Sequence, residues 1–332
     1  MDRWYRSRER SCQMEKHRLV PKIFYYTFAA HEPALRIHSG DTVTTETRDS
    51  MGVDARGNPL PEQMKQKVPG TSLKESNPAI GPIYVEEADE GDLLAVHIEQ
   101  IRLTRDFAVS KQTEHFGSLS GEVEGHHLLY NAPIQTIFYR WQLDLEQKTG
   151  TLNLPSSRVK SVEVPLKPFI GSIGVAPRFG RVETTLTPGE FGGNMDCVET
   201  REGTTLFLPV WVKGAYLSFG DIHALQGDGE VCGTALEVTA EVTLRIEVIK
   251  GHRFDWPRLE NETHIMVIGS TRPLMDCVRL AQMGLLNWLV DEYGFQREEV
   301  WQLMAQVGSM RIGNIVDPCY TVVARFPKRY LP

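Results

Sequence analysis

The sequence lacks several features that would assign it to a common class of protein. No apolar run approaches the roughly 20 residues of a membrane helix, so we expect no membrane partner. An excess of positive charge is missing too: the formal net charge is −7, which gives no electrostatic reason to expect nucleic acid as a partner. The first residues are charged and no apolar segment follows them, so we expect no signal peptide.

Motifs for disulfide, nucleotide and nucleophile chemistry are also missing. The five cysteines are widely spaced and form no Cys-x-x-Cys pair, which favours reduced thiols in a cytoplasmic protein. No Gly-x-Gly-x-x-Gly or Walker loop points to a nucleotide cofactor, and no Gly-x-Ser-x-Gly elbow is present. Cys197 is a poor nucleophile candidate, because the carboxylate of adjacent Asp196 would raise the pKa of its thiol.

Most of the first 250 residues show the pattern of short strands separated by turns. Apolar and polar residues alternate over 94–99 and, for longer, over 236–248, a period that is typical of half-buried strands. Segments 205–212 and 264–269 are further strand candidates. Dense Gly and Pro turns between short strands predict a sandwich or a barrel.

Helical periodicity appears only near the C-terminal end. Apolar residues at three- and four-residue spacing predict a helix that begins behind Pro273 and stops near Gly294. A second helix is predicted over 297–307, with two glutamates in its first turn, where the helix dipole favours acids. Residues 315–326 return to a strand pattern.

These patterns predict a mainly β chain with an α+β C-terminal part. We expect residues 1–17 to be a mobile lead-in that takes no part in the fold. Residues 18–170 are expected to form a β-sandwich domain. Residues 171–332 are expected to form a β-rich part that carries the active-site motifs and the helices.

The glycine-rich stretch 219–237 is the most informative part of the chain. It contains five potential metal ligands: Asp221, His223, Asp228, Glu230 and Glu237. Alternate side chains of an extended backbone point the same way, and glycine allows close approach to a ligand. Asn194 and Asp196 form another such pair beside glycine. An ordinary turn explains any single pair of this kind. The occurrence of several such pairs in one chain makes a divalent metal site as good an explanation as turns. His115 and the pair His126–His127 are weaker pocket candidates.

Several motifs occur in the same order as in the acetamidase/formamidase family, which the chain resembles from residue 18 to 332. They span residues 40–49, 81–92, 171–177, 192–196, 220–230, 311–316 and 326–328. The resemblance implies hydrolysis of small amides to carboxylate and ammonia by a jelly-roll-like β-sandwich joined to a smaller α+β domain. It also implies a bound divalent ion, zinc or calcium. The positions carried over are Asp49, Asn194, Asp196, Asp221, His223, Asp228 and Glu230. Gln226 stands at a variable place in its motif, so we do not expect it to be essential.

Amides are poor electrophiles, so hydrolysis needs a strong nucleophile and stabilisation of the oxyanion; a metal-activated water would meet the first need. Imidazole with carboxylates suits zinc, so we expect His223 with Asp196 and Asp228 as ligands. Asp221 is expected to join them or to orient His223 through its other ring nitrogen.

The catalytic roles fall on three further positions. Glu230 is the expected general base, and Asn194 is expected to hold the oxyanion or the amide nitrogen. Asp49 joins this set by resemblance alone.

Two other functions stay open. One is hydrolysis of a cyclic amide or another small C–N bond at the same site. The other is a metal-stabilised β-sandwich that binds a ligand without catalysis. The expected partner is a small-molecule amide, and a homodimer is the expected assembly.

Overall fold

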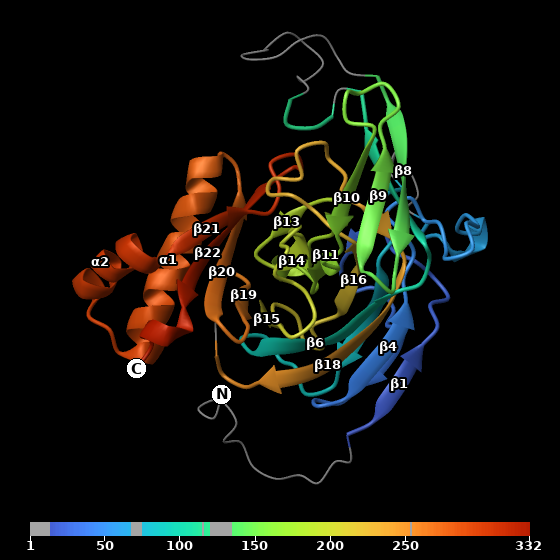
Figure 1. Cartoon of the computed structure of the whole chain (residues 1–332). Helices are drawn as coiled ribbons and strands as arrows, with labels where there is room; N and C mark the ends of the chain where they lie inside the picture. The colour runs from blue at the N-terminus through green and yellow to red at the C-terminus, as the bar shows by residue number, and fades with distance from the viewer. Residues whose placement is uncertain (1–13, 68–74, 115, 120–134, 253) are drawn as a thin grey trace.

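The structure, a computed structural model, describes residues 14–67, 75–114, 116–119, 135–252 and 254–332. His115, His126 and His127 lie outside these residues. Strands dominate the described part, and its two α-helices lie near the C-terminus, so the predicted mainly β class with an α+β end is confirmed (Figure 1). In the described ranges, none of the helices has the length and apolar character that crossing a membrane requires.

The first large sheet has nine strands. In spatial order they are β1 (Lys16–Leu19), β4 (Thr42–Glu46), β18 (Ala240–Ile249), β6 (Leu93–Leu103), β15 (Thr205–Pro209), β19 (Arg258–Glu260), β20 (His264–Thr271), β22 (Tyr320–Pro327) and β21 (Ser309–Ile312). Strand β18 lies between β4 and β6, so early and late parts of the chain alternate across this sheet. The alternation predicted for 236–248 is confirmed along β18, where Ala240, Val242, Leu244 and Ile246 are buried.

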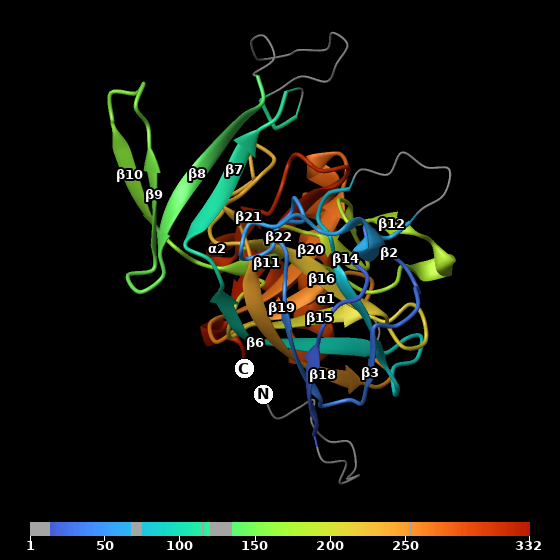
Figure 2. The same cartoon turned by 90° about the vertical axis from the view of Figure 1, so that its right-hand side faces the viewer.

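The second large sheet positions the candidate site. Its order is β10 (Ser161–Pro165), β9 (Thr149–Asn153), β8 (Ile137–Asp144), β7 (Phe107–Gln112), β17 (Glu237–Val238), β16 (Leu217–His223), β11 (Phe169–Gly174), β14 (Gly192–Asn194) and β13 (Pro188–Gly189). Strand β5 (Ile80–Val85) pairs with β16, and β3 (Leu35–Ile37) pairs with β5. A small separate sheet joins β2 (Thr27–Phe28) to β12 (Glu183–Thr184). Strands β8, β9 and β10 extend away from the body (Figure 2).

The two large sheets share one apolar core. It includes Val242 and Leu244 from β18 and Phe219 and Ile222 from β16, all fully buried. Complete burial of one such side chain stabilises the fold by about 1.5–3 kcal/mol, so this shared core fixes one sheet against the other. The candidate site is thereby held on a packed scaffold.

The two helices cover the end of the nine-stranded sheet. Helix α1 (Leu274–Tyr293) packs on β20 and β22 through a second core that includes Leu285 and Leu289, and α2 (Arg297–Val307) packs on α1 (Figure 1). Gly294 ends α1 in a left-handed conformation, with φ of 73°. Its N–H donates hydrogen bonds to backbone carbonyls in the last turn of the helix. Both helices agree with the predicted bounds. Three short 3₁₀ turns complete the structure: η1 (Glu62–Met64), η2 (Arg178–Gly180) and η3 (Lys328–Tyr330).

Three expectations from the sequence need correction. Lys16 and His17, expected outside the fold, belong to β1, which pairs with β4. The last strand begins at Tyr320 rather than near residue 315, because residues 313–319 form a loop. Both large sheets take strands from either side of residue 170, so a boundary there does not separate two sheets.

Candidate functional site

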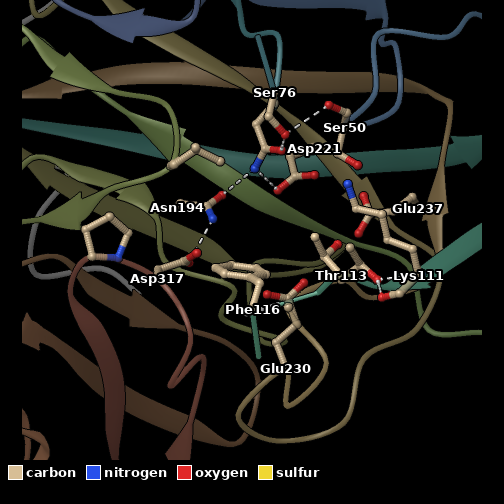
Figure 3. Close-up of a pocket in the computed structure, with 15 residues that line it drawn as sticks. Ser50, Ser76, Lys111, Thr113, Phe116, Asn194, Asp221, Glu230, Glu237 and Asp317 are labelled. Carbon is tan, nitrogen blue, oxygen red and sulfur yellow. Dashed lines mark hydrogen bonds between the residues drawn. The ribbon is translucent and has the colours of Figure 1, made fainter. Parts of the chain in front are cut away.

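Distant segments of the chain meet around a pocket of about 150 Å³. Its polar wall comes from the loop before β5, the end of β14, strand β16, the loop and strand 225–238, and the loop 313–319. Five of the polar side chains that line it are Asn194, Asp221, Glu230, Glu237 and Asp317 (Figure 3). Phe116, Leu186 and Pro318 form an apolar wall. The pocket therefore combines a dense acidic surface with a small apolar one.

Strand pairing places the imidazole among the acids. In the antiparallel ladder of β16 and β17, His223 lies directly opposite Glu237, and their side chains approach to 3.5 Å. Asp221, two residues earlier on β16, lies 3.3 Å from Nε2 of His223, as the alternation of side chains along a strand predicts.

Gly171 on β11 makes room for this arrangement. A Cβ at this position would lie 2.9 Å from the His223 ring and 3.0 Å from the Asp196 carboxylate. A residue with a side chain would therefore push the two groups apart, which explains why glycine stands in the middle of a buried strand.

The buried His and acidic residues form three overlapping triads. Within each triad the potential ligand atoms lie within 4.8 Å of one another: Asp196, Asp221 and His223; His223, Glu230 and Glu237; Asp196, Glu230 and Asp317. Each pair of triads shares one residue. The six side chains consequently form one continuous cluster rather than three separate sites.

Four side chains of the pocket region sit on left-handed backbone. Asn77, Asp196, Asp221 and Glu230 have φ values of 54°, 47°, 57° and 47°. Residues other than glycine rarely adopt this conformation, which costs about 1–3 kcal/mol at each position and persists only where the surroundings impose it. Such strain collects at functional sites, so these four positions mark the cluster independently of its charge.

Two asparagines connect the acids by hydrogen bonds. The side-chain amide of Asn77 donates to Asp221 Oδ2 at 2.8 Å and to Asn194 Oδ1 at 3.1 Å. Asn194 donates in turn to Asp317 Oδ2 at 2.9 Å (Figure 3). Asn314 accepts from the backbone N–H of Asp317, which holds the 313–319 loop in place.

Burial shifts the protonation of the cluster. It raises the pKa of Glu237 to about 8 and that of Asp317 to about 7, and it raises those of Asp196 and Glu230 well above the ordinary range. Burial alone would lower the pKa of His223, but the charges of Glu237 and Asp221 outweigh it and raise that pKa to about 10. The cluster thus holds protons that a cation would replace.

In the part of the chain that the structure describes, three buried oxygens of the cluster accept no well-aligned hydrogen bond. They are Asp196 Oδ1, Asp221 Oδ1 and Glu237 Oε2, of which the Asp221 atom lies 3.3 Å from His223 Nε2. A buried carboxylate oxygen without a partner is costly, and a divalent cation satisfies such oxygens directly. The residues present therefore fit a metal ion.

The comparisons with known proteins agree with the motifs. A model of the Acetamidase/Formamidase family matches residues 28–181 and 180–329. The chain belongs to this family. An acetamidase from Yersinia enterocolitica has a TM-score of 0.82 and 35% identity, covering 97% of this chain and 94% of that one. An acetamidase from Bacillus Halodurans has a TM-score of 0.78 and 31% identity, covering 95% and 98%. An acetamidase of Mycolicibacterium smegmatis is 45% identical over 69 residues, 20% of this chain and 17% of that protein's length.

Of the seven residues that the sequence analysis places in the site, five lie close together in the structure and two do not. Asn194, Asp196, Asp221, His223 and Glu230 are together in the cluster. Asp228 instead points to the surface, where its side chain is 49% exposed and accepts from Arg311 at 2.5 Å. Asp49 forms a buried ion pair with Arg105 at 2.9 Å, and Arg105 donates to the backbone carbonyl of Glu237. Asp49 is thus linked to the cluster through Arg105.

The ring of His223 is oriented by Gln226. Gln226 Oε1 lies 2.9 Å from His223 Nδ1, and its Nε2 donates to the carbonyls of Asp196 and Gly313. Gln226 therefore takes the orienting role that the sequence suggested for Asp221, and it leaves Nε2 of the imidazole directed at the acids.

Three residues of the site did not appear in the expected set. Glu237 was noted in the glycine-rich stretch but given no role, and Asp317 and Asn77 were not singled out. Asp317 stands in a segment with a strand pattern, and Asn77 precedes Pro78, which is ordinary for a turn. The available signal was Glu237, which ends the glycine-rich stretch that holds the other acids and which the pairing of β16 with β17 brings opposite His223.

Proposed function

We propose that this protein hydrolyses small aliphatic amides to the carboxylate and ammonia with the help of a divalent cation. Membership of the Acetamidase/Formamidase family and structural similarity to two acetamidases support the reaction class. The observation that carries the proposal is the group of buried carboxylate oxygens beside His223 to which the described residues supply no well-aligned hydrogen-bond donor. Such a group, at the end of a pocket, suits metal-assisted attack on a carbonyl.

The ligand set that the geometry favours differs from the one expected from the sequence. His223 with Asp196 and Asp221 would hold the ion, Glu237 lies 3.5 Å from the same imidazole nitrogen, and Asp228 is left out because it is bonded to Arg311. One imidazole with several carboxylates suits zinc, and the number of oxygens also suits calcium. A bound ion would supply a lowered pKa for water and polarisation of the amide carbonyl.

Glu230 is the residue that we assign to proton transfer. It lines the pocket, lies 4.0 Å from His223 Nε2, and has a pKa that burial raises above its ordinary range. A general base is most effective when its pKa lies near the working pH, which an exposed glutamate does not reach. Glu230 takes the proton of the attacking water and delivers it to the departing nitrogen.

Asn194 holds the substrate rather than the developing negative charge. Its Nδ2 already donates to Asp317 and Asp196, while among the described residues its Oδ1 accepts one hydrogen bond, from Asn77. An amide oxygen has a second lone pair, which can accept the N–H of the substrate amide. The apolar wall of Phe116, Leu186 and Pro318 then receives the acyl group.

An ammonia-release screen tests the reaction. We expect formamide, acetamide or propionamide to be hydrolysed, with release of ammonia, much faster than a lactam is opened; lactam opening releases no ammonia and is measured by the amino acid it forms. Ring opening of the lactam without hydrolysis of the linear amides would favour the cyclic-amide alternative. Elemental analysis of the same preparation identifies the ion.

Substitution of Glu230 by glutamine tests its role. The change keeps the size of the side chain and removes the basic oxygen, so kcat should fall by about 10²–10⁴ while the metal content stays unchanged. The exposed Glu262→Gln variant is the matched control and should keep its activity. Full activity in Glu230→Gln would remove Glu230 as the base.

A further inference from the structure

Asp228 and Arg311 join the loop that carries Glu230 to an edge strand of the other sheet. Nε and Nη2 of Arg311 donate to Asp228 Oδ1 at 2.9 and 2.5 Å. Arg311 belongs to β21, the last strand of the nine-stranded sheet. The same arginine lies 3.6 Å from the buried carboxylate of Glu199, which holds the guanidinium in position from behind.

Backbone contacts strengthen this connection. The N–H of Gly229 donates to the carbonyl of Ile312 at 2.9 Å, and the N–H of Ile315 donates to the carbonyl of Gly229 at 3.0 Å. Gly229 and Asn314 form a parallel bridge. The loop around Gly229 therefore lies along residues 312–315 like a very short additional strand.

The connection joins two acidic groups of one triad. Glu230 follows Gly229 directly, and Asp317 follows the 312–315 segment; their oxygens and that of Asp196 lie within 4.8 Å. Glu230 also sits on strained backbone, with φ of 47°. Strained backbone keeps its conformation only where neighbouring contacts hold it, and the contacts on this side are those to β21 and the segment after it.

We propose that the Asp228–Arg311 pair is a clamp that positions Glu230 in the pocket, and that Asp228 is a positioning residue rather than a metal ligand. The proposal rests on the proposed function, because it assigns the positioning to the general base. A base displaced by a fraction of an ångström transfers protons less well even when substrate and ion still bind. Loss of the clamp should therefore lower kcat more than it changes KM.

The experiment compares Asp228→Asn, Asp228→Glu and wild type. Asp228→Asn removes the charge that holds Arg311, and Asp228→Glu retains it. Asp276→Asn on α1 is the matched control, since Asp276 forms a similarly exposed pair with Arg279 far along the chain from the loop. Arg311 itself is left unchanged, because its removal would also weaken the surroundings of buried Glu199.

Three quantities are measured for each variant: kcat and KM for acetamide, metal content, and hydrogen–deuterium exchange over residues 225–236. For Asp228→Asn we expect kcat to fall about three- to fivefold, as the loss of a partly exposed ion pair allows, with KM and metal content unchanged and exchange faster. Asp228→Glu should recover most of the rate, and Asp276→Asn should match wild type.

The outcomes separate the alternatives. Loss of metal together with activity in Asp228→Asn would make Asp228 a ligand and overturn the clamp. Unchanged kcat, or unchanged exchange, would overturn it as well. If wild type hydrolyses no amide, the proposed function fails on its own, and the exchange measurement still decides whether the pair holds the loop.

Discussion

At the scale of single residues, burial decides which acids of the cluster keep their protons. It raises the pKa of Asp317 to about 7 and that of Glu237 to about 8, because a low-dielectric surrounding disfavours the charged form. A cation binds the deprotonated carboxylates, so binding has to release these protons.

We therefore expect the affinity for a divalent ion to rise from about pH 7 to about pH 10, the pKa of His223, whose ring must also lose its proton, and to be lost as the pH falls through that range. Calorimetric titrations in buffers of different ionisation enthalpy measure both the affinity and the protons released. In Glu237→Gln the release of one proton near pH 8 should disappear. An affinity that does not change over this range would contradict a metal site in this cluster.

The sequence reveals those site residues whose neighbours are unusual and misses those whose neighbours are ordinary. Asp196, Asp221 and Glu230 stand beside glycines in acidic motifs, which is detectable. Glu237 occupies a polar position of an alternating pattern, and only its pairing opposite His223 reveals it. Asp228 was misassigned because its spacing shows only that it is near Glu230 in sequence. The directions of the two side chains depend on the backbone torsion angles at Gly229 and Glu230, which the spacing does not give.

At the scale of elements, long periodic segments were predictable and the loops between them were not. The bounds of α2 and the alternation of β18 follow directly from the spacing of their apolar residues. The apolar residues of the loop 313–319 follow a strand-like pattern. Its Asn314 and Gly313 instead form hydrogen bonds with distant segments of the chain. A jelly-roll topology stays a prediction.

Phe116 is the part of the apolar wall that is attached to the loop carrying Glu230. Its ring, beyond β7, lies against Gly233, where a Cβ would lie 2.1 Å from the ring. The N–H of Gly233 donates to the carbonyl of Glu230 at 2.6 Å, so this part of the wall is attached to the turn that carries the proposed base. Figure 3 shows Phe116 beside Glu230. The position of the ring limits the space for the acyl group.

We expect Phe116→Ala to shift the specificity toward longer acyl chains. The ratio of kcat/KM for butyramide to that for acetamide should rise by about tenfold or more, the effect of accommodating additional methylene groups in an apolar pocket. Leu119→Ala, an exposed change in the same segment, is the control and should leave the ratio unchanged. An unchanged ratio in Phe116→Ala would mean that the acyl group lies elsewhere.

At the scale of the whole molecule, the cluster exists only when both sheets are complete. Its six side chains come from β16, β17 and the segments after β14, β16 and β21, and these elements pair with strands from all parts of the chain. The unfolded chain cannot hold the six side chains together, so an ion that binds the cluster binds the native state far better than the unfolded one.

Removal of the ion should consequently lower Tm. An ion at a hundredfold excess over its Kd stabilises the native state by about 2.7 kcal/mol, which chelation withdraws. Asp196→Asn provides the sharper comparison, because it removes a fully buried carboxylate whose charged form burial disfavours. Without metal, this variant should therefore have a higher Tm than metal-free wild type. Added ion should raise its Tm only slightly. Differential scanning calorimetry with and without chelator measures both effects, and ammonia release from the same samples separates a catalytic ion from a purely structural one. If the ion only stabilised the sandwich, Tm would fall on chelation while no amide was hydrolysed at any metal concentration.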